Sequence, residues 1–179
     1  NVPLLRERGM VAEFFITSDF IGQPGMLEIG HIRALADAGM GVQSHGRSHR
    51  FLEDLDAEAM YAELRDSKAR LEAASGQRVT GIAFPGGRGG GRERDTALRL
   101  GYRHVLGSVP GRNRERRPHE CYQRIAVTRD LSLEDFAALV AWRGWRPRLA
   151  QARFRALRIP KRLLGNERYQ RLRARLLAR

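Results

Sequence analysis

Cysteine is almost absent from this sequence, and its scarcity excludes two classes of protein. Cys121 is the only cysteine among 179 residues, so the chain can form neither an internal disulfide framework nor a cysteine-rich zinc site. No neighbouring motif indicates a reactive thiol. We interpret Cys121 as a small, half-buried apolar residue.

Long apolar runs are also missing. No run approaches the roughly 18 residues that a transmembrane helix needs, yet hydrophobic residues make up 42% of the chain, which excludes a disordered protein. A length of 179 residues suits one domain with one core. The chain begins with Asn1 and enters at once what resembles the middle of a domain, so we expect further residues before it. The compartment therefore stays open between bacterial cytoplasm and cell envelope, with membrane association as one form.

Acidic residues are scarce in one part of the chain only. Residues 142–179 hold thirteen Lys and Arg but a single acid, Glu167, whereas residues 1–141 hold twenty basic and nineteen acidic side chains. The body is thus close to neutral, and the basic charge belongs to the C-terminal end. This distribution argues against a protein that binds a specific nucleic acid across its whole surface.

Apolar runs, helical periodicity and Gly or Pro breaks predict an alternation of strands and helices. The predicted strands cover residues 11–17, 41–44, 79–84, 102–106 and 123–127, and the predicted helices cover residues 27–38, 56–75, 92–100 and 132–142. Such alternation predicts an α/β fold with a mostly parallel sheet, either open or closed into a barrel. A loop rich in Gly, Pro and Arg should occupy residues 107–120.

Two histidines follow directly after a predicted strand. His45 and His49 are four residues apart, a spacing that places two side chains on one face of a helical turn. They lie at the carboxyl end of the strand, where α/β proteins build their active sites. Imidazole suits zinc and other divalent transition metals, but a catalytic zinc usually has three protein ligands. By themselves the two could equally be surface histidines on a polar turn.

Several ordered segments resemble one family. GVQSHGRSHRFLEDL, ELRDSKARLEAASGQRV and GIAFPGGR are similar to the polysaccharide deacetylases with a NodB-homology domain, carbohydrate esterase family 4. LLRERGMVAEFFITSDFIGQPGML resembles the stretch after that family's first catalytic motif. The resemblance covers roughly residues 1–140. It implies an irregular (β/α)7 barrel of the NodB type, incomplete at the N-terminus, that hydrolyses acetamide groups of an N-acetylated polysaccharide or oligosaccharide.

The resemblance also implies a site. His45 and His49 match the two histidines that bind the family's divalent metal, for which we expect zinc. Pro85, Gly86 and Gly87 match the third motif, which lines the substrate site and helps to bind the acetyl group and its oxyanion. The chemistry agrees: a metal can activate water and polarise a carbonyl, and a glycine after Pro85 offers an unobstructed backbone N–H.

The sequence departs from the family at several positions. The first motif carries two adjacent aspartates, a third metal ligand and a general base, and we expect them upstream of Asn1, so that these 179 residues alone should be inactive. Ala83 stands where many members have arginine, and Arg88 either takes over part of that role or is a solvated loop residue. Gly86 replaces an aromatic, which predicts a more open sugar-binding wall. His104 and His119 are the candidates for a general acid, but neither lies in a matching motif, and a non-catalytic role is favoured for both.

We divide the chain into a NodB-like domain, residues 1–142, and an arginine-rich helical tail, residues 143–179. Residues 148–159 and 167–178 each place apolar side chains on one helical face. Such helices could pack on the barrel, lie on an anionic membrane surface, or bind another polyanion.

The leading hypothesis is a metal-dependent N-deacetylase of envelope or exopolysaccharide metabolism. A non-catalytic, carbohydrate-binding relative of the deacetylases and a basic polyanion-binding protein are the alternatives.

Overall fold

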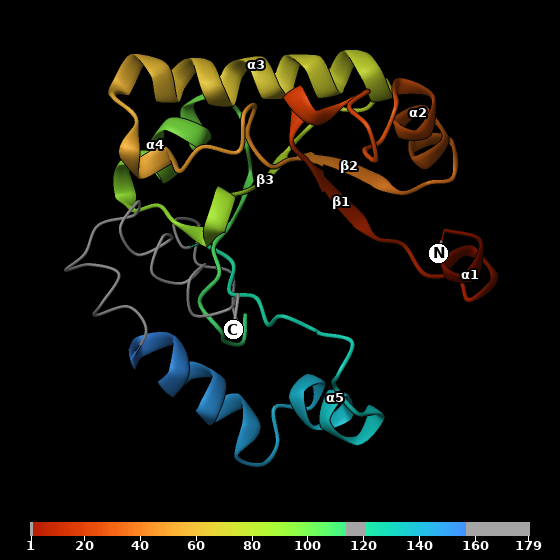
Figure 1. Ribbon diagram of the computed structural model, residues 1–179, viewed down its shortest axis with the longest axis vertical. Coiled ribbons are helices and arrows are strands. Elements are labelled where there is room, and N and C mark those ends of the chain that lie inside the picture. The colour runs from red at the N-terminus through yellow and green to blue at the C-terminus, as the bar shows by residue number, and fades with distance from the viewer. Residues whose placement is uncertain (1, 114–120, 157–179) are drawn as a thin grey trace. The chain divides into compact units, whose positions relative to one another are not determined.

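The structure is a computed structural model that describes residues 2–113 and 121–156 (Figure 1). The chain separates into two compact units. The first comprises Asn1–Ser108 with Glu115–Tyr122, and the second comprises Val109–Arg114 with Gln123–Arg179. The division between residues 142 and 143 stays a prediction.

The first unit contains a four-stranded parallel sheet. Its strands are β1 (Glu13–Ile16), β2 (Gly41–Ser44), β3 (Gly81–Ala83) and β4 (His104–Leu106), and they neighbour one another in sequence order. Tyr122 continues this order through a parallel bridge to Leu106. The predicted α/β fold with parallel strands is confirmed, and each of the first four predicted strands is present.

Helices join the strands, as the alternation predicts. They are α2 (Ile29–Asp37), α3 (Ala57–Ser75) and α4 (Gly91–Arg99), preceded by α1 (Val2–Glu7). Figure 1 shows α3 running along one side of the sheet, with α2 and α4 near the two ends of α3. No helix within the described residues is long and apolar enough to span a bilayer.

The longest helix, α3, has clear signals at both ends. The Asp56 carboxylate accepts a hydrogen bond of 2.8 Å from the Ala59 N–H, so it caps a donor that the helix leaves unused. Gly76 ends the helix in the left-handed region, with φ of +71°, where a side chain would be strained. Both ends were predicted to within one residue.

One apolar core holds these elements together. The fully buried side chains, from helices, strands and the residues next to them, include Ile32, Met40, Val42, Met60, Leu64, Leu71, Ile82, Phe84 and Tyr102. Tyr102 is buried with its hydroxyl donating to the Leu64 carbonyl oxygen at 2.9 Å. Burial raises the pKa of that hydroxyl, so it stays a neutral donor at any ordinary pH.

The second unit contains α5 (Leu133–Val140), and residues 146–156 are also helical. The Ser132 hydroxyl caps α5 by accepting from the Asp135 N–H at 3.1 Å. Arg146 pairs with the Asp135 carboxylate and so links the two helical segments. The remainder of the predicted helix 148–159, and all of 167–178, lie outside the described residues.

The predicted strand 123–127 is wrong. Those residues belong to no strand or helix. Asn113 takes both polar groups of the Gln123 backbone, and the Arg124 N–H donates to the Val109 carbonyl. Local alternation suggested a strand here, but these loop contacts satisfy backbone groups that a neighbouring strand would otherwise pair.

Replacing Asp56 with alanine should lower the free energy of unfolding by about 1 kcal/mol, because the α3 cap is lost. Urea denaturation followed by circular dichroism measures this. Asp37→Ala is the control, since it removes an exposed carboxylate from the last turn of α2 and should not destabilise the protein. Equal losses in both variants would contradict the capping assignment.

Candidate metal and deacetylation site

The two histidines lie on the loop that follows β2. Residues 45–49 are not helical, so the spacing argument that placed both side chains on one helical face gives the wrong reason. The loop itself brings them together, with Gly46 at φ of +82° and His49 at φ of +65°. The centroids of the two rings are 5.0 Å apart in an edge-to-face arrangement. His45 is half-buried and His49 is exposed.

A carbonyl of the neighbouring strand orients His45. Its Nδ1 lies 2.6 Å from the carbonyl oxygen of Ala83, at the end of β3. A carbonyl can only accept, so Nδ1 carries the proton and the lone pair of the neutral ring is on Nε2. Histidine ligands of protein metals characteristically donate their other nitrogen in this way. The His49 ring stacks on Phe20, with 6.1 Å between centroids.

A buried glutamate of α3 accepts hydrogen bonds from the histidine loop, residues 45–49. Glu63 is 4% exposed, and its Oε1 accepts from the backbone N–H groups of Arg47 at 2.8 Å and Ser48 at 2.6 Å. The Ser48 hydroxyl donates to the same carboxylate. The sequence predicts a helix over residues 56–75, but Glu63 is not among the predicted site residues.

A serine one turn further along α3 completes this support. The Ser67 hydroxyl donates to the Gly46 carbonyl at 3.0 Å and lies 2.8 Å from the Ser44 hydroxyl. Glu63 and Ser67 are four residues apart, so they share one face of the helix. That face also carries Met60, Leu64 and Leu71, and a polar pair within this predicted apolar stripe was the signal available in the sequence.

The Pro85-Gly86-Gly87 loop lies beside the histidine loop. A Cβ atom on Gly46 would stand 3.4 Å from Pro85 Cγ. Gly86 and Gly87 both have positive φ, +62° and +64°, which explains two consecutive glycines. The Gly87 and Arg88 N–H groups donate to the Phe84 and Pro85 carbonyls, so Gly86 is the position whose amide is the candidate for an oxyanion.

Phe51 and Arg88 form the wall next to that loop. A Cβ atom on Gly86 would meet Phe51 Cε1 at 2.5 Å, so the Phe51 ring fills the space beside the glycine. The Arg88 guanidinium stacks on the same ring, 4.5 Å from its centroid, and pairs with Glu53 at 3.4 Å. Arg88 is therefore not a solvated loop residue, since its side chain is 14% exposed. Its role toward substrate, like the greater openness expected at Gly86, stays a prediction.

The donors fit a divalent metal in kind but not in number. His45 presents an oriented imidazole with its lone pair on Nε2, and His49 lies against it. Within the described ranges, no group of three His, Cys, Asp or Glu side chains could hold a metal ion. Asp19, whose backbone is close by, directs its carboxylate to Arg47 and Arg70 at 3.5 and 3.1 Å.

The remaining candidate residues lie elsewhere. His104 Nδ1 is 3.2 Å from the Tyr122 hydroxyl, and His31 accepts from the Glu28 N–H at the start of α2. His119 lies outside the described residues. Cys121 is half-buried, and burial raises the pKa of its thiol, which favours the inert interpretation.

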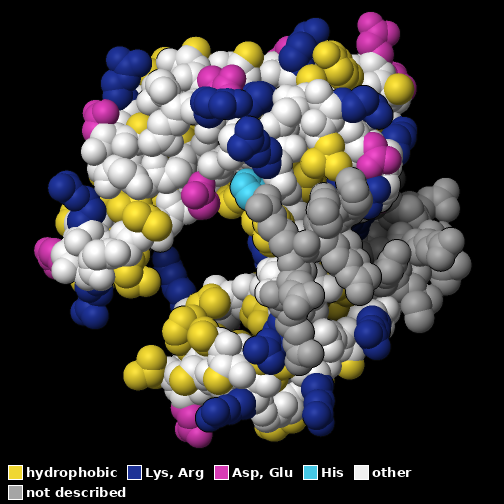
Figure 2. Space-filling view, turned by 180° about the vertical axis from the view of Figure 1, so that it is seen from behind, with side chains coloured by type: hydrophobic (Ala, Val, Ile, Leu, Met, Phe, Trp, Pro, Cys, Tyr) yellow, Lys and Arg dark blue, Asp and Glu magenta, His cyan; other side chains and the backbone are white. Residues whose placement is uncertain are grey.

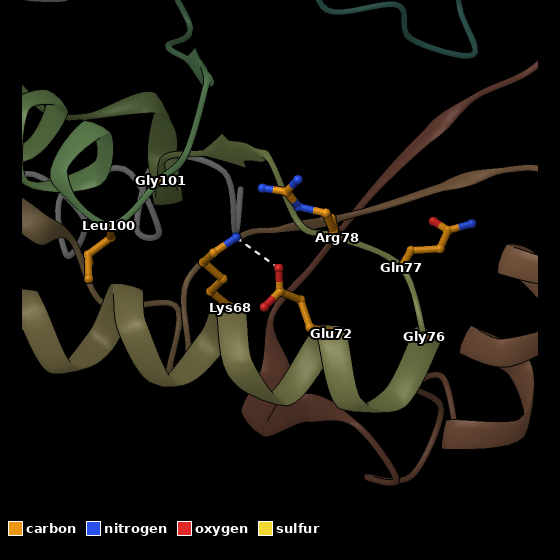
Figure 3. Close-up of a pocket in the computed structure, with 7 residues that line it drawn as sticks. All are labelled: Lys68, Glu72, Gly76, Gln77, Arg78, Leu100 and Gly101. Atoms are coloured by element: carbon orange, nitrogen blue, oxygen red, sulfur yellow. Dashed lines mark hydrogen bonds and ion pairs between the residues drawn. The ribbon is translucent and has the colours of Figure 1, made fainter.

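A separate pocket of about 520 Å³ opens at the C-terminal end of α3 (Figure 3). Lys68 and Glu72, one turn apart on α3, both line it and form an ion pair at 2.9 Å. Burial raises the pKa of Glu72, but hydrogen bonds from Lys68 and the Val79 N–H outweigh this and leave the pKa below its usual value. Both charges are thus engaged with each other, and no site residue lines this pocket.

The molecular surface agrees with the near-neutral body. On the face in Figure 2, acidic side chains lie among the basic ones, and a histidine side chain reaches the surface. The part of the chain visible there does not present one continuous basic patch.

Gly87→Ala should destabilise the protein by more than Gly25→Ala. Both glycines have positive φ, so both variants incur a backbone cost of about 1 kcal/mol. A Cβ atom on Gly87 would also lie 2.1 Å from the side chain of Ser108, whereas one on Gly25 meets nothing within 4 Å. Thermal denaturation compares the two, and equal shifts would show that the loop can open without cost.

Comparison with known proteins places this geometry in a family. A family model of polysaccharide deacetylases matches residues 1–105. The Bacillus subtilis protein YxkH, named as a polysaccharide deacetylase, is 26% identical over 138 residues, which are 77% of this chain and 50% of that protein. The chain therefore spans about half the length of this relative.

Solved structures share the fold. The Streptococcus pyogenes deacetylase PplD, in complex with acetate, superposes with a TM-score of 0.72 at 23% identity, over 77% of this chain and 62% of that one. A pseudoenzyme of carbohydrate esterase family 4 from Bacillus anthracis superposes with a TM-score of 0.54 at 19% identity, over 60% and 37% of the two chains. The predicted NodB-type barrel fold is thereby confirmed, and the chain belongs to the polysaccharide deacetylase family.

Proposed function

We propose that this chain carries the metal-binding part of a hydrolase that removes N-acetyl groups from a polysaccharide or a sugar precursor. The observation that carries the proposal is the pair of imidazoles, with ring centroids 5.0 Å apart and His45 fixed by the Ala83 carbonyl. The pair lies beside a glycine loop that matches the family's substrate-binding motif. Family membership supports the same reaction class.

The histidine loop and the Pro85-Gly86-Gly87 loop would have different roles in amide hydrolysis. His45 and His49 would hold the divalent metal, for which we favour zinc. That metal would supply a Lewis acid for the acetamide carbonyl and lower the pKa of a water. The Gly86 N–H would donate to the developing oxyanion, because its neighbours' amides are already used within the turn. Phe51, backed by Arg88, would form one wall of the sugar site.

Water activation needs a base, and a catalytic zinc usually needs a third protein ligand. Among the described residues, no His, Cys, Asp or Glu side chain completes a three-ligand metal group with the two histidines. We propose that both are carboxylates of an aspartate pair like that of the family's first motif. Activity then depends on that pair as well as on His45 and His49.

The substrate we propose is an N-acetylated polysaccharide or oligosaccharide of the bacterial envelope or an exopolysaccharide. The acetate bound to PplD is the product that such a reaction would release. Cytoplasm and envelope both remain open as compartments.

A non-catalytic relative is the second candidate. It is favoured by the incomplete donor set among the described residues and by the similar fold of the pseudoenzyme from Bacillus anthracis. The two candidates differ in one property, since only the enzyme releases acetate.

We further propose that the basic C-terminal part contacts an anionic membrane surface. Residues 143–156 hold five arginines and no acid. Trp145 is 62% exposed, and Leu149 is exposed on the adjoining helical segment. Exposed Trp and Leu among arginines are typical of helices that lie at a lipid interface.

Removing either histidine should weaken zinc binding by more than about tenfold, because each would supply a direct ligand. Equilibrium dialysis followed by elemental analysis measures zinc bound by the wild type, His45→Ala and His49→Ala. His31→Ala is the control, since His31 lies on α2 and contacts Glu28 instead. Equal zinc in all four proteins would refute the ligand assignment.

Acetate release from N-acetylglucosamine oligosaccharides decides between enzyme and non-catalytic relative. We expect none from these 179 residues alone, and release from a longer chain that adds an aspartate pair before Asn1. Release should disappear on His45→Ala. Full activity from the 179 residues would refute the proposed role of the aspartate pair. A longer chain that carries the pair but releases no acetate would favour the non-catalytic relative.

Binding to vesicles tests the membrane proposal. We expect the chain to sediment with vesicles that contain phosphatidylglycerol and not with pure phosphatidylcholine, because arginine attraction needs anionic headgroups. Deleting residues 148–179, or changing Arg148 and Arg153 to glutamate, should abolish sedimentation. Changing Arg33 and Arg103 of the first unit to glutamate is the matched control, and this change should leave sedimentation intact. An unchanged result after deletion would overturn the proposal.

A further inference from the structure

The Glu63 carboxylate is one of two buried carboxylates among the described residues of the first unit, and its partners distinguish it from the other. It is 4% exposed, and a buried charge of this kind is costly unless it is fully hydrogen-bonded. Its partners are the backbone N–H groups of Arg47 and Ser48 and the Ser48 hydroxyl, at 2.6 to 3.1 Å. All of them lie on the histidine loop, 15 or 16 residues before it in sequence.

The backbone of His49 needs such support. It has φ of +65°, a left-handed conformation that is unfavourable for a residue with a Cβ. Strained conformations of this kind persist only where the surroundings determine them. The two peptide N–H groups that Glu63 binds come immediately before His49, so the carboxylate fixes the direction in which the chain enters that residue.

A second set of contacts holds the outside of the same loop. The Arg47 side chain pairs with Asp19 at 3.5 Å and with Asp66 at 3.2 Å, and its Nε lies 4.0 Å from Glu63 Oε2. The two aspartate pairs are partly exposed and contribute little individually. The buried contact to Glu63 is therefore the stronger constraint on the loop.

We propose that Glu63 is a positioning residue for the metal site: its carboxylate holds His49 in the left-handed backbone conformation that faces its ring toward His45. The proposal rests on the metal site proposed above. Glu63 would not be a metal ligand, since both of its oxygens accept hydrogen bonds from the histidine loop. It would act through its contacts with Arg47 and Ser48, which precede His49.

Glu93 provides a matched comparison. It is 5% exposed and accepts a 2.6 Å hydrogen bond from the Gly90 N–H, so it resembles Glu63 in burial and chemistry. Its bonds, however, serve the first turn of its own helix, α4, with Arg92 as the charged partner. A purely structural role for Glu63 predicts that the Glu63 and Glu93 variants behave alike.

The first test uses the metal-free protein. Backbone chemical shifts of isotope-labelled chain report the left-handed conformation of His49 directly. We expect Glu63→Ala to lose the left-handed shifts at His49, Glu63→Gln to keep them in part because its amide oxygen can still accept, and Glu93→Ala to leave them unchanged. Left-handed shifts retained in Glu63→Ala would overturn the proposal, whatever the metal does.

The second test adds cobalt(II) as a spectroscopic metal probe. Cobalt affinity is read from the visible absorption band. It should fall at least tenfold in Glu63→Ala, by less in Glu63→Gln, and by under twofold in Glu93→Gln. All three variants should lower the melting temperature. Unchanged cobalt affinity in both Glu63 variants would also overturn the proposal. If instead wild type and His45→Ala bind cobalt equally weakly, the proposed metal site fails, and the metal-free shifts still decide the role of Glu63.

Discussion

The buried carboxylate of Glu63, which binds two consecutive backbone N–H groups, is the interaction on which the arrangement of the candidate site depends. It joins the middle of α3 to the loop after β2, two segments that the chain separates by more than a dozen residues. A buried acceptor left without donors would destabilise the protein by several kcal/mol. The helix and the loop therefore cannot be rearranged independently of one another.

The same helix has two tasks. Met60, Leu64 and Leu71 pack into the core, while Glu63 and Ser67, on the same inward side, bind the histidine loop. Parallel pairing supplies the rest of the site, because Ser44 of β2 lies opposite Ile82 of β3. The residues that follow these two strands therefore meet at one edge of the sheet, which is how the His45 ring reaches the Ala83 carbonyl.

Much of this could be predicted from the sequence, because the relevant signals are local. Apolar runs, helical periodicity and Gly or Pro breaks predicted the first four strands and the helices between them, and the family resemblance predicted that the histidine and glycine loops belong to one site. The network around Glu63 could not be read in the same way, since its contacts join residues far apart and a glutamate in a helix usually indicates a solvated face. Phe51 against Gly86 and Arg88 was missed for the same reason. The strand prediction for residues 123–127 was wrong for a different reason. Their local pattern suits a strand, but the N–H groups of Gln123 and Arg124 donate to a side chain and a loop carbonyl instead.

The protein contacts around the two histidines determine what limits metal binding. His45 is oriented by Ala83 and the loop by Glu63, and both of these partners belong to the protein. Such contacts order the loop, so little conformational entropy should be lost when an ion binds. Affinity should then depend mainly on how many ligands the site offers. Two imidazoles are fewer than a catalytic zinc usually has, so a single added carboxylate should strengthen binding by much more than any further ordering of the loop could.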